Sequence, residues 1–298
     1  MTSTFSKNAI AAAAGVAADR IFGEPSVDPH PVALFGSVMS RVEDVLYRPR
    51  RLAGALHTSI GVAVGAAAGA LLGSTALATY VSVAQRALTE AGLEVAAALD
   101  ADDLPRARQL LPTLVGRDPS GLDASEITRA VVESLAENTV DAVVAPAVWG
   151  AVLGAAGTLG YRAVNTMDAT VGYRDERYTD YGWASARLDD VANYVPARLT
   201  AALVAAVRPG SALAVWRAVR RDAPAHPSPN SGVAEAAFAA ALGVRLGGVN
   251  TYASRTETRP QLGRGRPPEP SDIAAAALLC RDVTTGLVGA LVALAAVT

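Results

Sequence analysis

The sequence has very little cysteine, lysine or aromatic side chain. Cys280 is the only cysteine, so the chain can form neither an intramolecular disulfide nor a cysteine metal cluster. Lys7 is the only lysine, so nearly every cation is an arginine, whose planar guanidinium binds phosphates and carboxylates through paired donors. Aromatic residues make up 5% of the chain, and no sustained apolar–polar alternation predicts strands. No phosphate-loop signature ending in glycine-lysine occurs, so any ATP site is of another kind.

Charge is also scarce. Charged residues are 18% of the sequence and hydrophobic residues 51%, with a mean hydropathy of +0.27. These values suit a membrane protein with sizeable polar loops, although an alanine-rich soluble helical enzyme would come close to them. The formal net charge of −2 gives no general attraction for nucleic acid, and we expect no nucleic-acid partner.

Long apolar runs are what the sequence does contain. The uncharged run 58–84 is long enough to cross a bilayer, and its glycines at 61, 65, 69 and 73 would let helices pack closely. Three weaker runs follow at 142–161, 199–216 and 283–298. We expect a mainly α, polytopic membrane helical bundle with about four or five embedded helices and sizeable helical loops on the cytoplasmic side. We treat 1–298 as a single domain and 254–272, rich in glycine and proline, as a flexible loop.

An acidic segment, DPSGLDASEITRAVVESLAENTVD, runs from Asp118 to Asp141. Asp123 and Glu126 have the spacing of a capping box, which predicts a helix start near Asp123. Three further carboxylates, at 133, 137 and 141, then recur every four residues, within an arc of roughly 80° along ~12 Å of helix. Such carboxylates repel one another, and a bound cation would offset this repulsion. The pattern therefore suggests a site for Mg²⁺ bound together with ATP. The alternative is a solvated acidic face neutralised by Arg129.

Two later segments are rich in polar residues. The stretch 161–198 is dense in Arg, Asp, Asn and Tyr, and its 174–177 part would also suit a surface loop of ion pairs. In HPSPNSGVAEAAF, starting at His226, Asn230 or Ser231 caps an alanine-rich helix. The N-terminus of that helix could receive a phosphate, with simple capping as the alternative.

These segments resemble successive blocks of one family. DRIFGEPSVDPHPVALFGSVMSRVE, VGRDPSGLD, VVESLAENTVDAVVAP, YRAVNTMDATVGYRDERYTDYGWASARLDDVANYVPARLTA and SPNSGVAEAAFAAALGVRLGGVNTY are similar to the adenosylcobinamide-phosphate synthases of cobalamin biosynthesis, the CbiB/CobD family. The resemblance implies a polytopic inner-membrane enzyme that joins adenosylcobyric acid to aminopropanol or its O-phosphate, with ATP as co-substrate and Mg²⁺. The partners that the resemblance implies are membrane lipid and either further copies of the chain or other cobalamin-assembly enzymes.

The resemblance, together with charge type, suggests a division of roles. The catalytic candidates are Glu133, Glu137, Asp141 and Asp190, and the metal candidates are Glu137, Asp141 and Asp168. The candidates for binding phosphate or substrate are Arg117, Arg129, Arg177, Arg187, Arg198, Asn193 and Asn230. An alternative is a membrane transporter or an AmpE-like membrane sensor without ligase chemistry, since intramembrane carboxylates also serve ion pathways.

The run 142–161 decides whether these groups can cooperate. If it crossed the bilayer as one straight helix, Asp141 and Arg162 would lie ~30 Å apart on opposite sides. Pro146 and the glycines at 150, 154, 157 and 160 predict instead a broken or re-entrant segment buried among other helices. We therefore expect a multi-pass protein of the cell membrane with both blocks on the cytoplasmic side.

Overall fold

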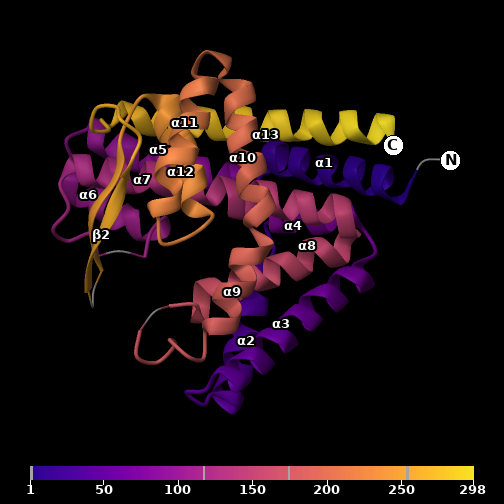
Figure 1. The fold of residues 1–298 in the computed structure, drawn as a ribbon. Coiled ribbons are helices and arrows are strands. Elements are labelled where there is room, and N and C mark those ends of the chain that lie inside the picture. The colour runs from indigo at the N-terminus through magenta and orange to yellow at the C-terminus, as the bar shows by residue number, and fades with distance from the viewer. Residues whose placement is uncertain (1–2, 117, 174, 253–254) are drawn as a thin grey trace. The chain divides into compact units, whose positions relative to one another are not determined.

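The computed structural model describes residues 3–116, 118–173, 175–252 and 255–298, and these are mainly helical, as predicted (Figure 1). The helices are α1 (Thr4–Phe22), α2 (Pro31–Leu46), α3 (Arg51–Leu72), α4 (Thr75–Ser82), α5 (Gln85–Asp100), α6 (Leu104–Leu110), α7 (Ala124–Thr139), α8 (Ala145–Val171), α9 (Trp183–Ala192), α10 (Tyr194–Val207), α11 (Ala212–Asp222), α12 (Ser231–Leu242) and α13 (Ser271–Val297). A π-helix, Val140–Val144, joins α7 to α8.

The chain divides into two compact units. Unit 1 comprises Met1–Ala84, Asp141–Pro196 and Leu287–Thr298, and unit 2 comprises Gln85–Val140 and Ala197–Gly286. The single domain expected from the sequence remains a prediction, and each unit is described by itself.

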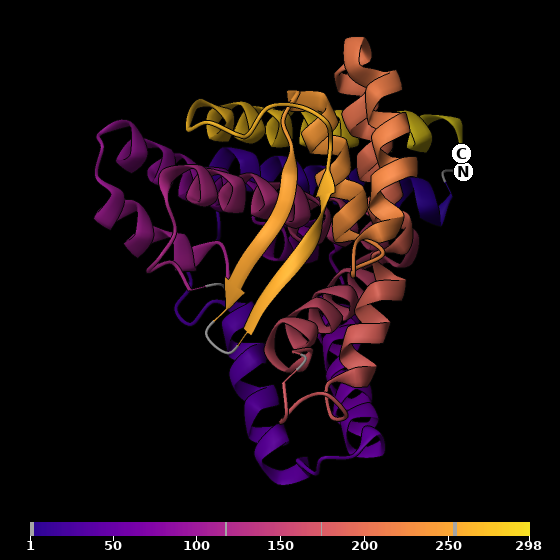
Figure 2. The same cartoon turned by 60° about the vertical axis from the view of Figure 1, so that its left-hand side comes forward.

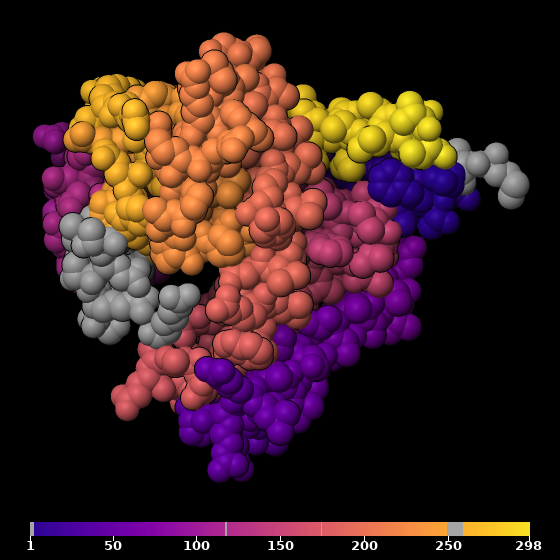
Figure 3. Space-filling view, in the orientation of Figure 1, coloured from indigo at the N-terminus to yellow at the C-terminus, as the bar shows by residue number. Residues whose placement is uncertain are grey.

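In unit 1, the glycine repeat packs α3 against α8 (Figure 1). A Cβ on Gly61 would collide with Met167, one on Gly65 with the Leu159 carbonyl, and one on Gly69 with the Ala155 carbonyl. The small-residue stripe therefore brings the two backbones together, as its spacing predicts. The first turns of α1 lie beside the end of α13 (Figure 3), where Ser6 Oγ and Thr298 Oγ1 are 3.0 Å apart.

The predicted break within 142–161 is confirmed. Gly154 interrupts α8 with φ 67° and ψ −156°, a conformation that is essentially restricted to glycine. The arms on either side fold back on one another, because Thr158 Oγ1 donates to the Pro146 carbonyl and Tyr161 Oη donates to the Asp141 carbonyl at 3.3 Å. The segment is a helical hairpin, so Asp141 and Tyr161 lie at the same end of it.

A substitution at the hairpin turn tests this backbone conformation. Gly154→Ala is expected to destabilise the protein by about 1–3 kcal/mol, because its Cβ finds room, with Asn8 and Thr75 at 3.4 Å, but the backbone is strained for alanine. Thermal unfolding in detergent measures the change. The matched control is Gly160→Ala, whose nearest neighbour, Ala66, lies at 3.7 Å and whose unfolding temperature should hardly move. Equal unfolding temperatures for the two variants would contradict the hairpin turn.

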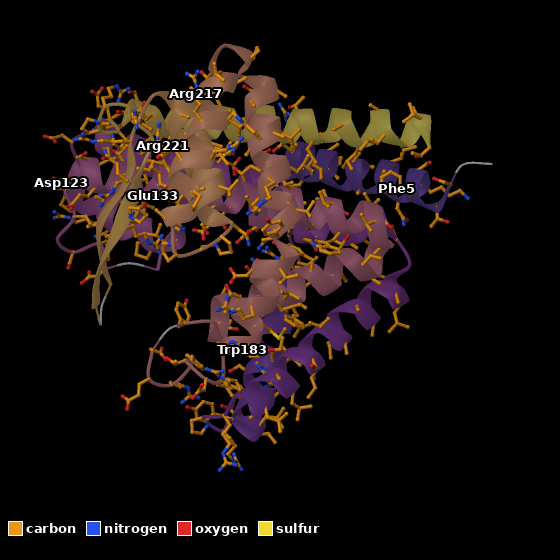
Figure 4. The ribbon with its side chains drawn as sticks, in the orientation of Figure 1. Phe5, Asp123, Glu133, Trp183, Arg217 and Arg221 are labelled. Carbon is orange, nitrogen blue, oxygen red and sulfur yellow. The ribbon has the colours of Figure 1, made fainter. Side chains whose placement is uncertain are left out.

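In unit 2, α7 begins at the predicted capping box. The Asp123 side chain accepts from the Glu126 backbone N–H, and the Glu126 side chain accepts in return from the Asp123 N–H. Helix α7 is deeply buried and packs against α5 and α12. Figure 4 shows Asp123 at the start of α7 and Glu133 further along it.

A β-hairpin in unit 2 differs from the prediction. Strands β1 (Leu246–Tyr252) and β2 (Arg255–Leu262) pair antiparallel (Figure 2), although no strand was predicted and part of β2 falls within the expected loop 254–272. The paired ends Leu246 and Leu262 are fully buried, and their burial anchors the hairpin. Both strands are rich in glycine, proline or charged residues, which have low strand propensity, so the sequence pattern did not predict them.

Several helices are suited to a membrane. Among the described residues, three helical stretches are long and apolar enough to cross one by length and composition: Arg51–Leu72, Ala124–Val171 and Ser271–Val297. The second of them is interrupted by the π-helix and by the turn at Gly154. A fourth arises if Tyr194–Val207 and Pro209–Ala225, bent by 111° at a break, form one span. The structure thus supports a multi-pass membrane protein with three or four candidate spans, and the higher number meets the lower end of the four or five expected.

Candidate functional site

Unit 1 contains a closed ring of hydrogen bonds, which we call the polar ring: Asp141, Tyr161, Asn165, Asp189 and Asn193. Asn165 Nδ2 donates to Asp141 Oδ2 at 3.2 Å and to Asp189 Oδ1 at 3.4 Å. Asn193 Nδ2 donates to Asp189 Oδ2 at 3.0 Å. Tyr161 Oη donates to Asn193 Oδ1 at 2.8 Å and to the Asp141 backbone carbonyl at 3.3 Å.

Three elements position this ring. Asp141 lies in the π-helix, a distortion that often occurs at functional sites. Tyr161 and Asn165 are one turn apart on the second arm of α8, and the Gly154 turn returns them to Asp141. Asp189 and its partner Asn193 are likewise one turn apart at the end of α9. The Trp149 indole holds α9 in place by donating to the Ala192 carbonyl at 3.1 Å.

The donor set of the ring fits Mg²⁺. Magnesium takes oxygen ligands, and proteins commonly supply only one or two carboxylates while phosphates and water complete the octahedron. Tyr161 and Asn193 are buried, whereas Asp141 and Asp189 are half-buried and retain access to a ligand. No group of three or more His, Cys, Asp or Glu side chains suited to a metal occurs in the described part of the chain, so Mg²⁺ would depend on an accompanying phosphate.

In unit 2, the two predicted acidic residues of α7 each have a specific partner. Glu133 is 4% exposed and accepts from the Gly247 backbone N–H at 2.8 Å. Arg129 donates to the Gly247 carbonyl, and its Nε lies 3.9 Å from Glu133 Oε1. Glu137 is half-buried and accepts from Ser231 Oγ at 2.6 Å. Glu133 is therefore bound to the start of β1, while Glu137 remains accessible.

The remaining predicted groups of unit 2 are Arg198, on α10, and Asn230, at the end of the loop before α12. Arg198 donates to Asn230 Oδ1 at 3.2 Å and to the Pro229 carbonyl at 3.3 Å. Asn230 is the N-cap of α12 but its side chain makes no cap hydrogen bond, so it serves Arg198 rather than the helix. His226 accepts the Ser228 N–H on Nδ1 at 3.1 Å, and its Nε2 lies 3.7 Å from the buried Glu235.

His226 makes the stability of this loop depend on pH. Burial is the largest effect on its pKa and lowers it below the ordinary value, which is about 6.5. The unfolded chain therefore takes up the proton first, so the stability that neutral His226 contributes is present above about pH 6.5 and is lost below it. Acidification from about pH 7.5 to about pH 5.5 should lower the apparent unfolding temperature more in the wild type than in His226→Gln. Parallel decreases in the two proteins would contradict this.

Other predicted residues lie elsewhere. Arg177 binds Glu43 at 2.9 Å and stacks on Tyr47, and that hydrogen bond raises the pKa of the guanidinium further above its ordinary value. Arg187 and Asp190 form a pair at 3.8 Å on α9. Asp168 lies on α8 with its carboxylate against Gly172. Arg117 lies outside the described residues.

Sequence reasoning missed Tyr161, Asn165 and Asp189 as members of the ring, and Ser231 as the partner of Glu137. Asp189 and Asn193 share a helical face at i, i+4, which was the available signal. Asn165 offers no such pattern, because its partners come from other elements.

Comparison with known proteins gives a consistent result. A family model described as CobD/Cbib protein matches residues 12–280. The chain is 46% identical over 297 residues to the cobalamin biosynthesis protein CobD of Mycobacterium tuberculosis, covering 95% of each chain. It is 42% identical over 264 residues to that of Geobacter metallireducens, covering 82% of this chain and 83% of the relative. It is 40% identical over 277 residues to that of Synechocystis, covering 84% and 80%. No solved structure matches the chain.

Proposed function

Because the chain belongs to the CobD/CbiB family of cobalamin biosynthesis proteins, we propose that it is an adenosylcobinamide-phosphate synthase. It would join adenosylcobyric acid to aminopropanol or aminopropanol O-phosphate at the expense of ATP. The observation that supports this best is the polar ring, since Asp141 comes from one block of the family-like sequence, Asn165 and Asp189 come from a later one, and the three meet in one unit.

The reaction needs a carboxylate made reactive and an amine made nucleophilic. In the first proposed reaction step, a corrinoid carboxylate oxygen takes the terminal phosphoryl group of ATP, and ADP leaves. The amine nitrogen then attacks the acyl carbon, the bond from that carbon to the phosphate oxygen breaks, and phosphate leaves. A proton passes from the ammonium group to a base. Catalysis of phosphoryl transfer is mostly positioning and electrostatic stabilisation, which a preorganised ring can provide.

In unit 1, Asp141 and Asp189 would hold Mg²⁺, which screens the phosphates and polarises the one that is transferred. Asn165 fixes the two carboxylates relative to one another by donating to both. Asn193 holds the other oxygen of Asp189, and Tyr161 positions Asn193 by donating to its amide oxygen. Asp168, three residues beyond Asn165 on the same helix, and Glu137 remain metal candidates.

In unit 2, Glu137 is the proposed base for the ammonium proton, since it is half-buried and Ser231 orients one of its oxygens. Arg198 and Asn230 are proposed to donate to phosphate oxygens, because their mutual hydrogen bond preorganises both. The proposed location is the cell membrane with both sets of residues facing the cytoplasm, where ATP is made available.

The decisive experiment is conversion of adenosylcobyric acid by the purified protein in detergent. With ATP, Mg²⁺ and either aminopropanol or its phosphate, mass spectrometry should detect the amide product and one ADP for each amide formed. Chelation of Mg²⁺ should stop product formation, and its return should restore it. A transporter or AmpE-like sensor would yield no amide under any of these conditions, and that result would refute the ligase.

A further inference from the structure

Unit 1 also contains an apolar cavity of about 420 Å³ that is open on one side and is lined by α2, α3, α4 and the second arm of α8. Its walls include Phe35, Val64, Leu72, Leu77, Val81 and Leu159. The volume lies within the range of about 300–1,000 Å³ that is usual for small-molecule sites. None of the residues of the polar ring lines it.

Among the residues that the structure describes, Arg162 is the one charged residue that lines this cavity. Its Nη1 donates to Asn165 Oδ1 at 3.3 Å, and its Nε is buried without a hydrogen-bond partner. The other polar lining group, Thr166, uses its hydroxyl to donate to the Arg162 carbonyl at 2.8 Å. Asp141 and Glu24 attract the Arg162 charge from beyond salt-bridge distance, and the guanidinium still has donors to spare.

Arg162 is half-buried, and a buried guanidinium N–H without a hydrogen-bond partner favours an anionic acceptor, because leaving such a donor unsatisfied is costly. The apolar walls favour a hydrocarbon chain beside that anion. A nucleotide triphosphate does not fit this description, since several negative charges would face a single cation and apolar walls. Helix α3, which forms one wall, is long and apolar enough to cross a membrane. The lipid bilayer around it would therefore supply molecules that combine an anionic group with a hydrocarbon chain.

We propose that this cavity binds one acyl chain of an anionic phospholipid, with the lipid phosphate at Arg162. The phosphate accepts hydrogen bonds from the free guanidinium donors, and the chain covers the apolar walls of α3 and α4. Because Arg162 also donates to Asn165 of the polar ring, the bound lipid would fix the residue that holds Asp141 and Asp189 together.

The proposal is tested by lipid binding alone, without turnover. The purified full-length protein is equilibrated in detergent with phosphatidylglycerol or phosphatidylcholine of identical acyl chains, and native mass spectrometry measures the lipid retained. We expect one phosphatidylglycerol per chain, retained in preference to phosphatidylcholine. Glycerol 3-phosphate, which has the phosphate without the chain, should not displace it.

Two variants probe the two parts of the site. Arg162→Gln should weaken phosphatidylglycerol binding roughly tenfold, as expected for loss of a charge-assisted hydrogen bond. Val81→Phe should lower retention of both lipids by filling the cavity. The matched controls are Arg41→Gln and Val45→Phe, both on exposed positions of α2, and these should bind like the wild type.

A measurement on the unaltered protein covers the case that a variant fails to fold. Phosphatidylglycerol should raise the apparent unfolding temperature of the wild type more than phosphatidylcholine or glycerol 3-phosphate does. Equal retention of the two lipids, equal thermal shifts, or folded Arg162→Gln and Val81→Phe variants that match their controls would overturn the proposal. None of these outcomes depends on ligase activity, so they are separate from the test of the proposed function.

Discussion

Replacing Asp189 by asparagine is expected to lower the rate of ATP-dependent amide formation by about 100-fold or more, the usual effect of losing a group that holds or orients a metal ion or its charge. The neighbouring substitution Asp190→Asn should lower it only a few-fold. The two carboxylates are adjacent in sequence, but Asp189 shares the Asn165 amide with Asp141. Asp190 instead faces Arg187 at 3.8 Å, with the side chains 31% and 68% exposed, and exposed pairs of this kind contribute little.

Asparagine nearly preserves the volume of aspartate, so the comparison isolates charge. The rate should be measured as a function of Mg²⁺ concentration, since loss of one ligand would raise the concentration needed for half-maximal activity. Asp141→Asn should behave like Asp189→Asn, because the two carboxylates are held by the same amide. If Asp190→Asn lost activity and Asp189→Asn kept it, the polar ring would not be the metal site, and the original expectation for Asp190 would stand.

The parts of the fold that sequence predicted are those set by local chemistry. The capping box at Asp123 and Glu126 depends on residues three positions apart, and it forms as expected. The glycines of α3 pack closely because small residues leave the backbone accessible. The break in α8 follows from Gly154, and it places Asp141 and Tyr161 at one end of a hairpin.

The parts that sequence could not predict depend on partners distant in the chain. The prediction that the carboxylates at 133, 137 and 141 line one helical face assumed one regular α-helix. In the structure α7 ends at Thr139, and Asp141 lies in a π-helix. The choice between Asp189 and Asp190 depends on which of them faces Asn165, and periodicity alone does not determine this. The β-hairpin forms through buried Leu246 and Leu262 at its ends, while its glycines and charged residues argue locally against strands.

Arg129 and Glu133 show how a residue predicted to bind substrate can have a large effect on stability. Their side chains are 14% and 5% exposed, lie 3.9 Å apart, and both bind Gly247. Arg129→Leu would remove a cation from beside the buried Glu133 carboxylate, and breaking a buried pair in this way typically destabilises a protein by about 3–5 kcal/mol. For a chain of this size the apparent unfolding temperature should fall by roughly 10 °C.

The chain provides a matched control for this prediction. Arg86 and Glu90 have the same i, i+4 spacing on α5, with a distance of 2.7 Å, but their side chains are 44% and 52% exposed. Arg86→Leu should therefore change stability by less than about 1 kcal/mol, although its ion pair is the shorter of the two. Burial rather than distance decides the size of the effect.

The double variant Arg129→Leu/Glu133→Gln separates the structural role of Arg129 from a role in binding phosphate. A neutral glutamine still accepts from the Gly247 N–H and no longer needs a cation, so the double variant should regain part of the lost unfolding temperature. Amide formation should follow the unfolding temperature if the pair acts only by holding β1 against α7. If Arg129→Leu unfolded at the same temperature as Arg86→Leu but formed no amide, Arg129 would bind substrate phosphate, as the sequence first suggested.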